Sequence, residues 1–443
     1  MKNKAIHYVD VVESRTDGAP GRQQCVLDHN ITFDKAAIEQ ATFRPLDDID
    51  IDLLVVISAV SYVDRLIRRR RGTQWSRALV VRVPVHHPET WSRLAGHLSA
   101  TLRLLSGDAW TFDFRQRQRP QQPQQFLPSL PPSFEGATVI PYSGGLDSFA
   151  LLARVRHYEP DEKVLLVNAR RLVVEQIARP DDVAMIGVPF ELRAPHHKEQ
   201  SYRTRTFKYL ALAALVWKKN SGKHILIGES GVGCLGPSLV PVGIEHPVRS
   251  SHPDFLHALR ALLGQLWATP PPFLFPHLWS TKGMVLAELR GLKTLEGWEN
   301  TRSCSRNVQR QHPGARGAQC GLCSGCLFRR VSVCAGKLGP EPPETYFEDV
   351  FRNAQPSAAL TDADRVVARC AIANMDELAG LADQVERRTA DIHELAASLQ
   401  RPVDETRLHL GKLVRVFRDE WRGLLAQLPE ASWIHSLTFH GAS

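Results

Sequence analysis

Four cysteines in the second half of the chain have the spacing of a metal site. Cys320, Cys323 and Cys326 form two overlapping Cys-x-x-Cys pairs, and Cys304 lies upstream of them. Such pairs bring sulfurs close enough to share one tetrahedral ion, and the fourth cysteine completes the set. Because four sulfurs leave no open position for a substrate, we expect a structural Zn²⁺. An iron–sulfur cluster or unligated cysteines are the alternatives, and Cys334 could take the place of Cys304.

The segment Ser143–Ser148, with the sequence Ser-Gly-Gly-Leu-Asp-Ser, is a second candidate site. It lies between an expected apolar strand and an expected helix, which is where an open parallel sheet binds ligands. Its two glycines let the backbone approach oxyanions, and the amides at the start of the helix attract negative charge. Asp147 could hold Mg²⁺ or cap the helix. The residues expected to contact a bound nucleotide here are Ser143, Gly144, Gly145, Leu146, Asp147 and Ser148.

Strands and helices alternate around this loop. The expected strands are Ala137–Tyr142, Lys163–Asn168, Val188–Arg193 and His224–Gly228. The clearest helix between them is Arg205–Lys219. Continuous apolar strands that alternate with helices are buried on both faces, which predicts a doubly wound parallel sheet and the α/β fold class.

Composition divides the chain into four parts. Residues 1–115 are expected to form a small α+β domain, with a strand at Ala78–Val85. Residues 116–134 are rich in proline and glutamine and predict an extended linker. Residues 135–338 would be the α/β domain with the cysteine site. Residues 339–443 carry apolar residues at three- and four-residue spacing, which predicts a helical domain.

The overall composition is that of an ordinary globular protein, with 43% hydrophobic and 23% charged residues, and it excludes global disorder. The net charge is +8, and half of it comes from Arg68–Arg71. This run is expected to be a solvated helix end or loop, with a patch facing nucleic acid or nucleotide as the alternative. The longest apolar runs, Leu53–Val63 and Tyr209–Trp217, are too short to span a bilayer, and no secretory signal is visible. We therefore expect a cytoplasmic protein without a membrane partner.

The loop and the cysteines together resemble the 7-cyano-7-deazaguanine synthase (QueC) family of PP-loop ATP pyrophosphatases. The likeness spans about Gly136–Val333. Further stretches that resemble family motifs in their order are Arg205–Ala213, Ile225–Gly228, Pro253–Phe255, Ser280–Gly283, Arg302–Cys304 and Cys326–Arg329. The resemblance implies a PP-loop ATPase domain that carries a zinc site.

The resemblance also implies a reaction. ATP would activate the carboxylate of 7-carboxy-7-deazaguanine as an acyl-adenylate with loss of pyrophosphate, and an amine would then attack it. Asp147 and Ser143 would act in catalysis, with Asp147 holding Mg²⁺. Arg205 and Lys282 are candidates to contact a phosphate or the substrate carboxylate, and a surface or ion-pair role is the alternative for each. Arg170, which is kept from the family's Tyr-Gly-Gln-Arg run, would contact the nucleotide.

The chain also departs from the family. The family's Tyr-Pro-Asp-Cys-Arg run corresponds poorly to Glu245–Arg249, and regions flank the α/β domain on both sides. Long QueC-like proteins with flanking domains resemble the QatC group of anti-phage defence proteins. For that group the implied chemistry is transfer of the activated deazaguanine to an amine on a partner protein, so we expect an operon-encoded partner as acceptor.

Three other functions stay open. The chain could be a 7-cyano-7-deazaguanine synthase proper, which uses ammonia. It could be a tRNA-modifying PP-loop enzyme, for which Cys234 is the one candidate catalytic cysteine; a nucleic-acid partner is possible but not favoured. It could also be a non-catalytic scaffold that senses nucleotides.

Overall fold

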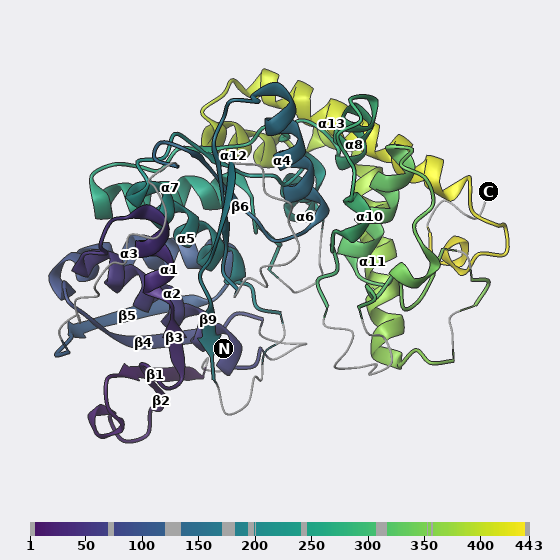
Figure 1. Cartoon of the computed structure of the whole chain (residues 1–443). Helices are drawn as coiled ribbons and strands as arrows, with labels where there is room; N and C mark the ends of the chain where they lie inside the picture. The colour runs from purple at the N-terminus through teal and green to yellow at the C-terminus, as the bar shows by residue number, and fades with distance from the viewer. Residues whose placement is uncertain are drawn as a thin grey trace. The chain divides into compact units, whose positions relative to one another are not determined.

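Figure 1 shows a computed structural model of the chain. It describes residues 5–69, 75–119, 134–170, 182–193, 199, 201–240, 246–306, 317–351, 353–355 and 358–438. Most of the predicted linker therefore lies outside the described residues. The chain divides into two units. Unit 1 comprises Met1–Ser143, Asp161–Ile227 and Val242–Leu274, and unit 2 comprises Gly144–Pro160, Gly228–Pro241 and Phe275–Ser443.

Unit 1 contains a four-stranded sheet built from the N-terminal region. Its strand order is β2 (Gln23–Val26), β1 (Ile6–Val12), β4 (Ala78–Val85) and β5 (Ala109–Gln116), and every neighbouring pair is parallel. The helices of this region are α1 (Lys35–Thr42), α2 (Asp48–Leu66) and α3 (Pro88–Ser106). Helix α2 is buried along almost its whole length, which explains the long apolar run from Leu53 to Val63.

Unit 1 also contains the predicted doubly wound sheet. The strand order is β11 (Phe273–Leu274), β10 (Ile225–Leu226), β6 (Thr138–Pro141), β7 (Val164–Asn168) and β8 (Val183–Gly187), and all pairs are parallel. Helix α5 (Arg205–Lys219) packs against β6 and β7. The α/β fold class predicted from the sequence is confirmed.

The prediction that Val188–Arg193 is a strand of this sheet is wrong. Strand β8 takes that position, and β9 (Phe190–Leu192) instead pairs antiparallel with β3 (Ile31–Phe33). Proline has no backbone N–H to donate to a ladder, so the parallel pairing ends before Pro189 and the chain turns toward β3. This pairing connects the N-terminal region to the chain segment that follows strand β8.

A buried ionic network stabilises the N-terminal part of unit 1. The Arg69 and Arg77 guanidinium groups each lie 2.6–3.0 Å from the carboxylates of Asp64 and Asp108. Burial alone would raise the pKa of Asp64, but the two guanidinium groups hold it below its usual value. Arg69 is only 2% exposed. At this position the arginine run is therefore neither a solvated helix end or loop nor a patch that faces nucleic acid, so both expectations are wrong here. Arg68 is exposed.

Unit 2 is helical. Its helices are α4 (Leu146–Tyr158), α6 (Gly231–Leu239), α8 (Lys282–Gly291), α10 (Ser324–Ala335), α11 (Asp362–Gly380), α12 (Thr389–Leu399) and α13 (Val403–Leu425). Helix α11 ends at Gly380, and two short 3₁₀ turns separate it from α12. The apolar face of α13 packs against α10, α11 and α12, so the helices on either side of residue 339 share one core. In the described part of the chain, none of the helices is both long and apolar enough to cross a bilayer.

Candidate functional site

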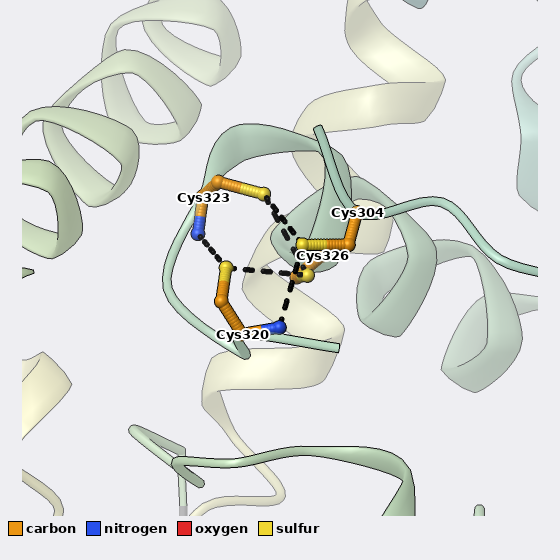
Figure 2. A group of neighbouring side chains, drawn as sticks. All are labelled: Cys304, Cys320, Cys323 and Cys326. Atoms are coloured by element: carbon orange, nitrogen blue, oxygen red, sulfur yellow. Dashed lines mark hydrogen bonds between the residues drawn. The ribbon is translucent and has the colours of Figure 1, made fainter. Parts of the chain in front are cut away.

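The four predicted cysteines converge on one point in unit 2. Figure 2 shows the side chains of Cys304, Cys320, Cys323 and Cys326 directed toward one another, and their sulfurs all lie within 4.8 Å. The Sγ···Sγ distances are 3.6 Å between Cys323 and Cys326, 3.8 Å between Cys320 and Cys326, and 4.0 Å between Cys304 and Cys323. Four sulfurs at about 2.3 Å from one tetrahedral ion stand about 3.8 Å apart, so the cluster is compatible with a structural Zn²⁺. An iron–sulfur cluster divides its four cysteines among two or four irons, so all four sulfurs would not lie within 4.8 Å of one another as they do here.

Local backbone features hold the sulfurs in place. Cys323 is the residue before α10, and its backbone N–H donates to the Cys320 sulfur at 3.3 Å. Gly321 has a φ of +75°, and a side chain there would collide with the backbone of Glu348, so only glycine fits this turn. Hydrogen bonding among the four thiols lowers the pKa of Cys304 and Cys323 and raises the pKa of Cys320 and Cys326.

Cys334 does not belong to the cluster. Its sulfur lies 3.5 Å from the Gln427 side chain, on α10 beyond the metal ligands. The arrangement therefore favours Cys304 as the fourth ligand over Cys334. Arg329, from the predicted Cys-x-x-Arg motif, is fully buried and pairs with Glu341, and it also donates to Thr301 just upstream of Cys304.

The Ser-Gly-Gly-Leu-Asp-Ser segment joins β6 to α4, as predicted. Gly144 has a φ of +75°, a conformation that glycine adopts readily, and helix α4 begins after Gly145. The hydroxyl of Ser148 donates to the Gly145 carbonyl at 3.0 Å. The backbone N–H of Arg302 donates to the Gly144 carbonyl at 3.0 Å, which connects the loop to the segment that carries Cys304. The cysteine site and Gly144 of the loop are therefore connected by a backbone hydrogen bond within unit 2.

Asp147 and Lys282, two separately predicted site residues, are brought together. Asp147 lies in the first turn of α4 and Lys282 in the first turn of α8, and their charged atoms are 2.8 Å apart. Burial lowers the pKa of Lys282, but the carboxylates of Asp147 and Glu229 raise it more, so the net shift is upward. Lys282 therefore forms an ion pair with Asp147 in this structure.

Glu229 is a site residue that the sequence analysis missed. Burial and repulsion by Asp147 raise the pKa of its carboxyl group to about 7, against the attraction of Lys282. The carboxyl groups of Asp147 and Glu229 therefore share one ammonium group, that of Lys282, and the charged form of Glu229 is poorly stabilised. Glu229 directly follows the predicted strand that ends at Gly228. Because parallel sheets bind ligands at the carboxyl ends of their strands, this position could have identified Glu229 as a candidate from the sequence.

The C-terminal helical region supports this site. Thr281 caps α8 by accepting a hydrogen bond from the Met284 N–H at 3.0 Å, and its hydroxyl donates to Glu420 on α13. Burial raises the pKa of Glu420 to about 7, against the hydrogen bond from Thr281, which lowers it. Helix α13 therefore helps to fix the turn from which Lys282 extends.

The remaining predicted residues lie in unit 1 or in the core. Ser143 is the last residue of the first segment of unit 1. Arg170 follows β7, Arg205 begins α5, and both side chains are exposed. Both lie near a buried lysine, Lys208, which the sequence analysis also missed. Cys234 is buried in the core of unit 2, where a substrate would not reach its thiol.

The chain matches no protein-family model, no curated protein and no solved structure. The parallel α/β sheet and the four-cysteine cluster are the parts of the family resemblance that the structure bears out.

Proposed function

We propose that the chain is an ATP-dependent ligase that adenylates a carboxylate and releases pyrophosphate. The observation that supports this most directly is the group formed by Asp147, Lys282 and Glu229 at the start of α4. A glycine-rich turn, a helix N-terminus, two carboxylates and a buried ammonium are the parts that such a reaction needs. The resemblance to the QueC family favours 7-carboxy-7-deazaguanine as the acid.

Each part has a distinct role in this proposal. The backbone amides and hydroxyls of Ser143–Ser148 bind the phosphates of ATP. Asp147 and Glu229 would hold Mg²⁺, which supplies positive charge against the departing pyrophosphate. A cation bound there would also relieve the repulsion that raises the pKa of Glu229. Lys282 adds a second fixed positive charge close to the loop.

The proposed reaction has two steps. A carboxylate oxygen of the acid attacks the α-phosphorus of ATP, and the bond between this phosphorus and the bridging oxygen breaks as pyrophosphate leaves. An amine nitrogen then attacks the acyl carbon, AMP leaves, and the nitrogen loses a proton. The product is an amide.

The acceptor that we propose is an amine on a partner protein encoded in an anti-phage defence operon. Ammonia needs no docking surface, whereas this chain has large regions before and after its α/β sheet. Intact-mass spectrometry of the partner after incubation with ATP, Mg²⁺ and the acid tests this point, and we expect a gain of one deazaguanine acyl group. Formation of free nitrile from ammonia, with an unchanged partner, would identify a synthase instead.

For the metal, we propose one structural Zn²⁺ held by Cys304, Cys320, Cys323 and Cys326. The site is closed by four sulfurs, and its role would be to fold the segment that hydrogen-bonds to Gly144. A Zn²⁺ ion there would therefore affect nucleotide binding only through the position of the loop.

Pyrophosphate release with the acid tests the role of the loop. We expect Asp147→Ala and Ser143→Ala to abolish it while the fold is retained. Glu288→Gln is the matched control, because Glu288 pairs with Arg154 across the same two helices, α4 and α8, away from the loop. Turnover near that of the native protein in both loop variants would remove the loop from the mechanism.

A further inference from the structure

A buried lysine in unit 1 has no acidic partner among the residues that the structure describes. Lys208 lies in the first turns of α5, only 7% of it is exposed, and no carboxylate or hydrogen-bond acceptor contacts its ammonium group among the described residues. The two lysines at the other end of the same helix are paired with acidic residues. Lys218 lies 2.8 Å from Asp50, and Lys219 pairs with Asp47 and Asp50. A desolvated ammonium without a counter-ion costs free energy, so Lys208 calls for another explanation.

Aromatic rings enclose this ammonium. The Nζ atom lies 5.4–5.7 Å from the ring centroids of Phe190, Tyr202 and Tyr209. Tyr202 has a φ of +37°, which is rare for a tyrosine, and its ring contacts both Lys208 and Arg65. The cation–π contacts hold Lys208 in a fixed position without neutralising its charge.

The charges around Lys208 are positive as well. Burial lowers its pKa to about 8, and Arg205, Arg170 and Arg65 lower it in the same direction. These groups come from three places in the fold: the start of α5, the end of β7 and the end of α2. The first turn of α5 contains no acidic residue, so its positive dipole end adds to the same charge.

The surrounding structure holds this arrangement in place. The Asp64 carboxylate, fixed by Arg69 and Arg77, accepts hydrogen bonds from the backbone N–H and the hydroxyl of Thr204, at 2.9 and 3.0 Å. Thr204 is the residue before α5, and Asp64 precedes Arg65. The buried ionic network of the N-terminal region therefore positions two members of the cationic group.

We propose that Lys208, Arg205, Arg170 and Arg65 form a binding site for an oxyanion of a small ligand, either a phosphate group or a carboxylate. The carboxyl end of a parallel strand and the N-terminus of a helix meet here, which is where α/β sheets bind ligands. Burial of Lys208 restricts the deepest contact to a small group. The family resemblance assigns Arg205 to a phosphate or the substrate carboxylate and Arg170 to the nucleotide, so the inference rests on the proposed function and adds Lys208 and Arg65 to its binding site.

Calorimetric titration of the full chain at constant ionic strength tests the site, with inorganic phosphate, pyrophosphate and benzoate as probes. We expect at least one probe to bind the native protein and to bind Lys208→Met at least tenfold more weakly. A preference for benzoate would assign the site to a carboxylate, and a preference for the other two to a phosphate. The loss of affinity caused by Lys208→Met should be the same when Asp147→Ala is also present, which separates this site from the loop.

Thermal unfolding without ligand separates a binding role from a structural one. Methionine fits the path of the lysine stem without its charge, so Lys208→Met should melt at the same temperature as the native chain or a few degrees higher. Lys219→Met, which breaks a buried pair, should melt lower. The proposal is overturned if all probes bind Lys208→Met as tightly as the native chain, or if Lys208→Met melts at as low a temperature as Lys219→Met. It is also overturned if a single-stranded oligonucleotide binds the native chain more tightly than every probe and loses that binding in Lys208→Met.

Discussion

The substitution Glu229→Gln should make the protein more stable. The pKa of Glu229 is raised from 4.5 to about 7, so folding favours its protonated form. The stability that this group contributes is complete below about pH 4.5 and is lost as the pH rises toward 7. This difference between the pKa values of the folded and unfolded states lowers the free energy of unfolding at pH 8 by about 3 kcal/mol. Glutamine resembles the protonated form at every pH and avoids the loss.

Differential scanning of thermal unfolding at pH 5 and pH 8 measures this effect. We expect Glu229→Gln to raise the unfolding temperature of unit 2 by roughly 6–12 °C at pH 8, and by much less at pH 5, where native Glu229 is already protonated in the folded chain. Glu288→Gln breaks an ion pair with Arg154 instead and should show no such gain. A Glu229→Gln variant that is no more stable than the native protein at pH 8 would refute the reasoning, because Lys282 would then compensate the charge fully.

Two further substitutions test other parts of the account. Asp64→Asn removes the carboxylate charge that Arg69 and Arg77 share, so the free energy of unfolding of unit 1 should fall by about 3 kcal/mol. The control Asp113→Asn removes a half-buried ion pair with Arg82 and should cost under about 1 kcal/mol. Equal melting temperatures for the two variants would contradict a role of the network in stability. Cys323→Ser should lower both the metal content and the melting temperature, measured by elemental analysis and calorimetry, and native protein that contains iron or no metal would contradict the zinc assignment.

The features that the sequence predicts well are local. The spacing of Cys320, Cys323 and Cys326 fixes the geometry of a turn and the start of a helix, and the glycine pair at Gly144 marks the passage from strand to helix. Continuous apolar strands indicate the parallel sheet because burial on both faces leaves no polar alternation.

The features that the sequence does not reveal depend on distant contacts. Arg65 lies in the last turn of an apolar helix, α2, and comes near Lys208 only because α2 packs on α5. Arg69 is one of four consecutive arginines, and nothing in the run says that this one pairs with two buried aspartates. Glu420 reaches the site through the packing of α13, more than a hundred residues after the strand that precedes Glu229.

Exchange of labelled pyrophosphate into ATP tests adenylation most directly, since it needs no acceptor. The account predicts that exchange requires both Mg²⁺ and 7-carboxy-7-deazaguanine, that Asp147→Ala abolishes it, and that Glu288→Gln retains it. Absence of exchange in the native protein with this acid, or equal exchange in Asp147→Ala, would contradict the proposed adenylation.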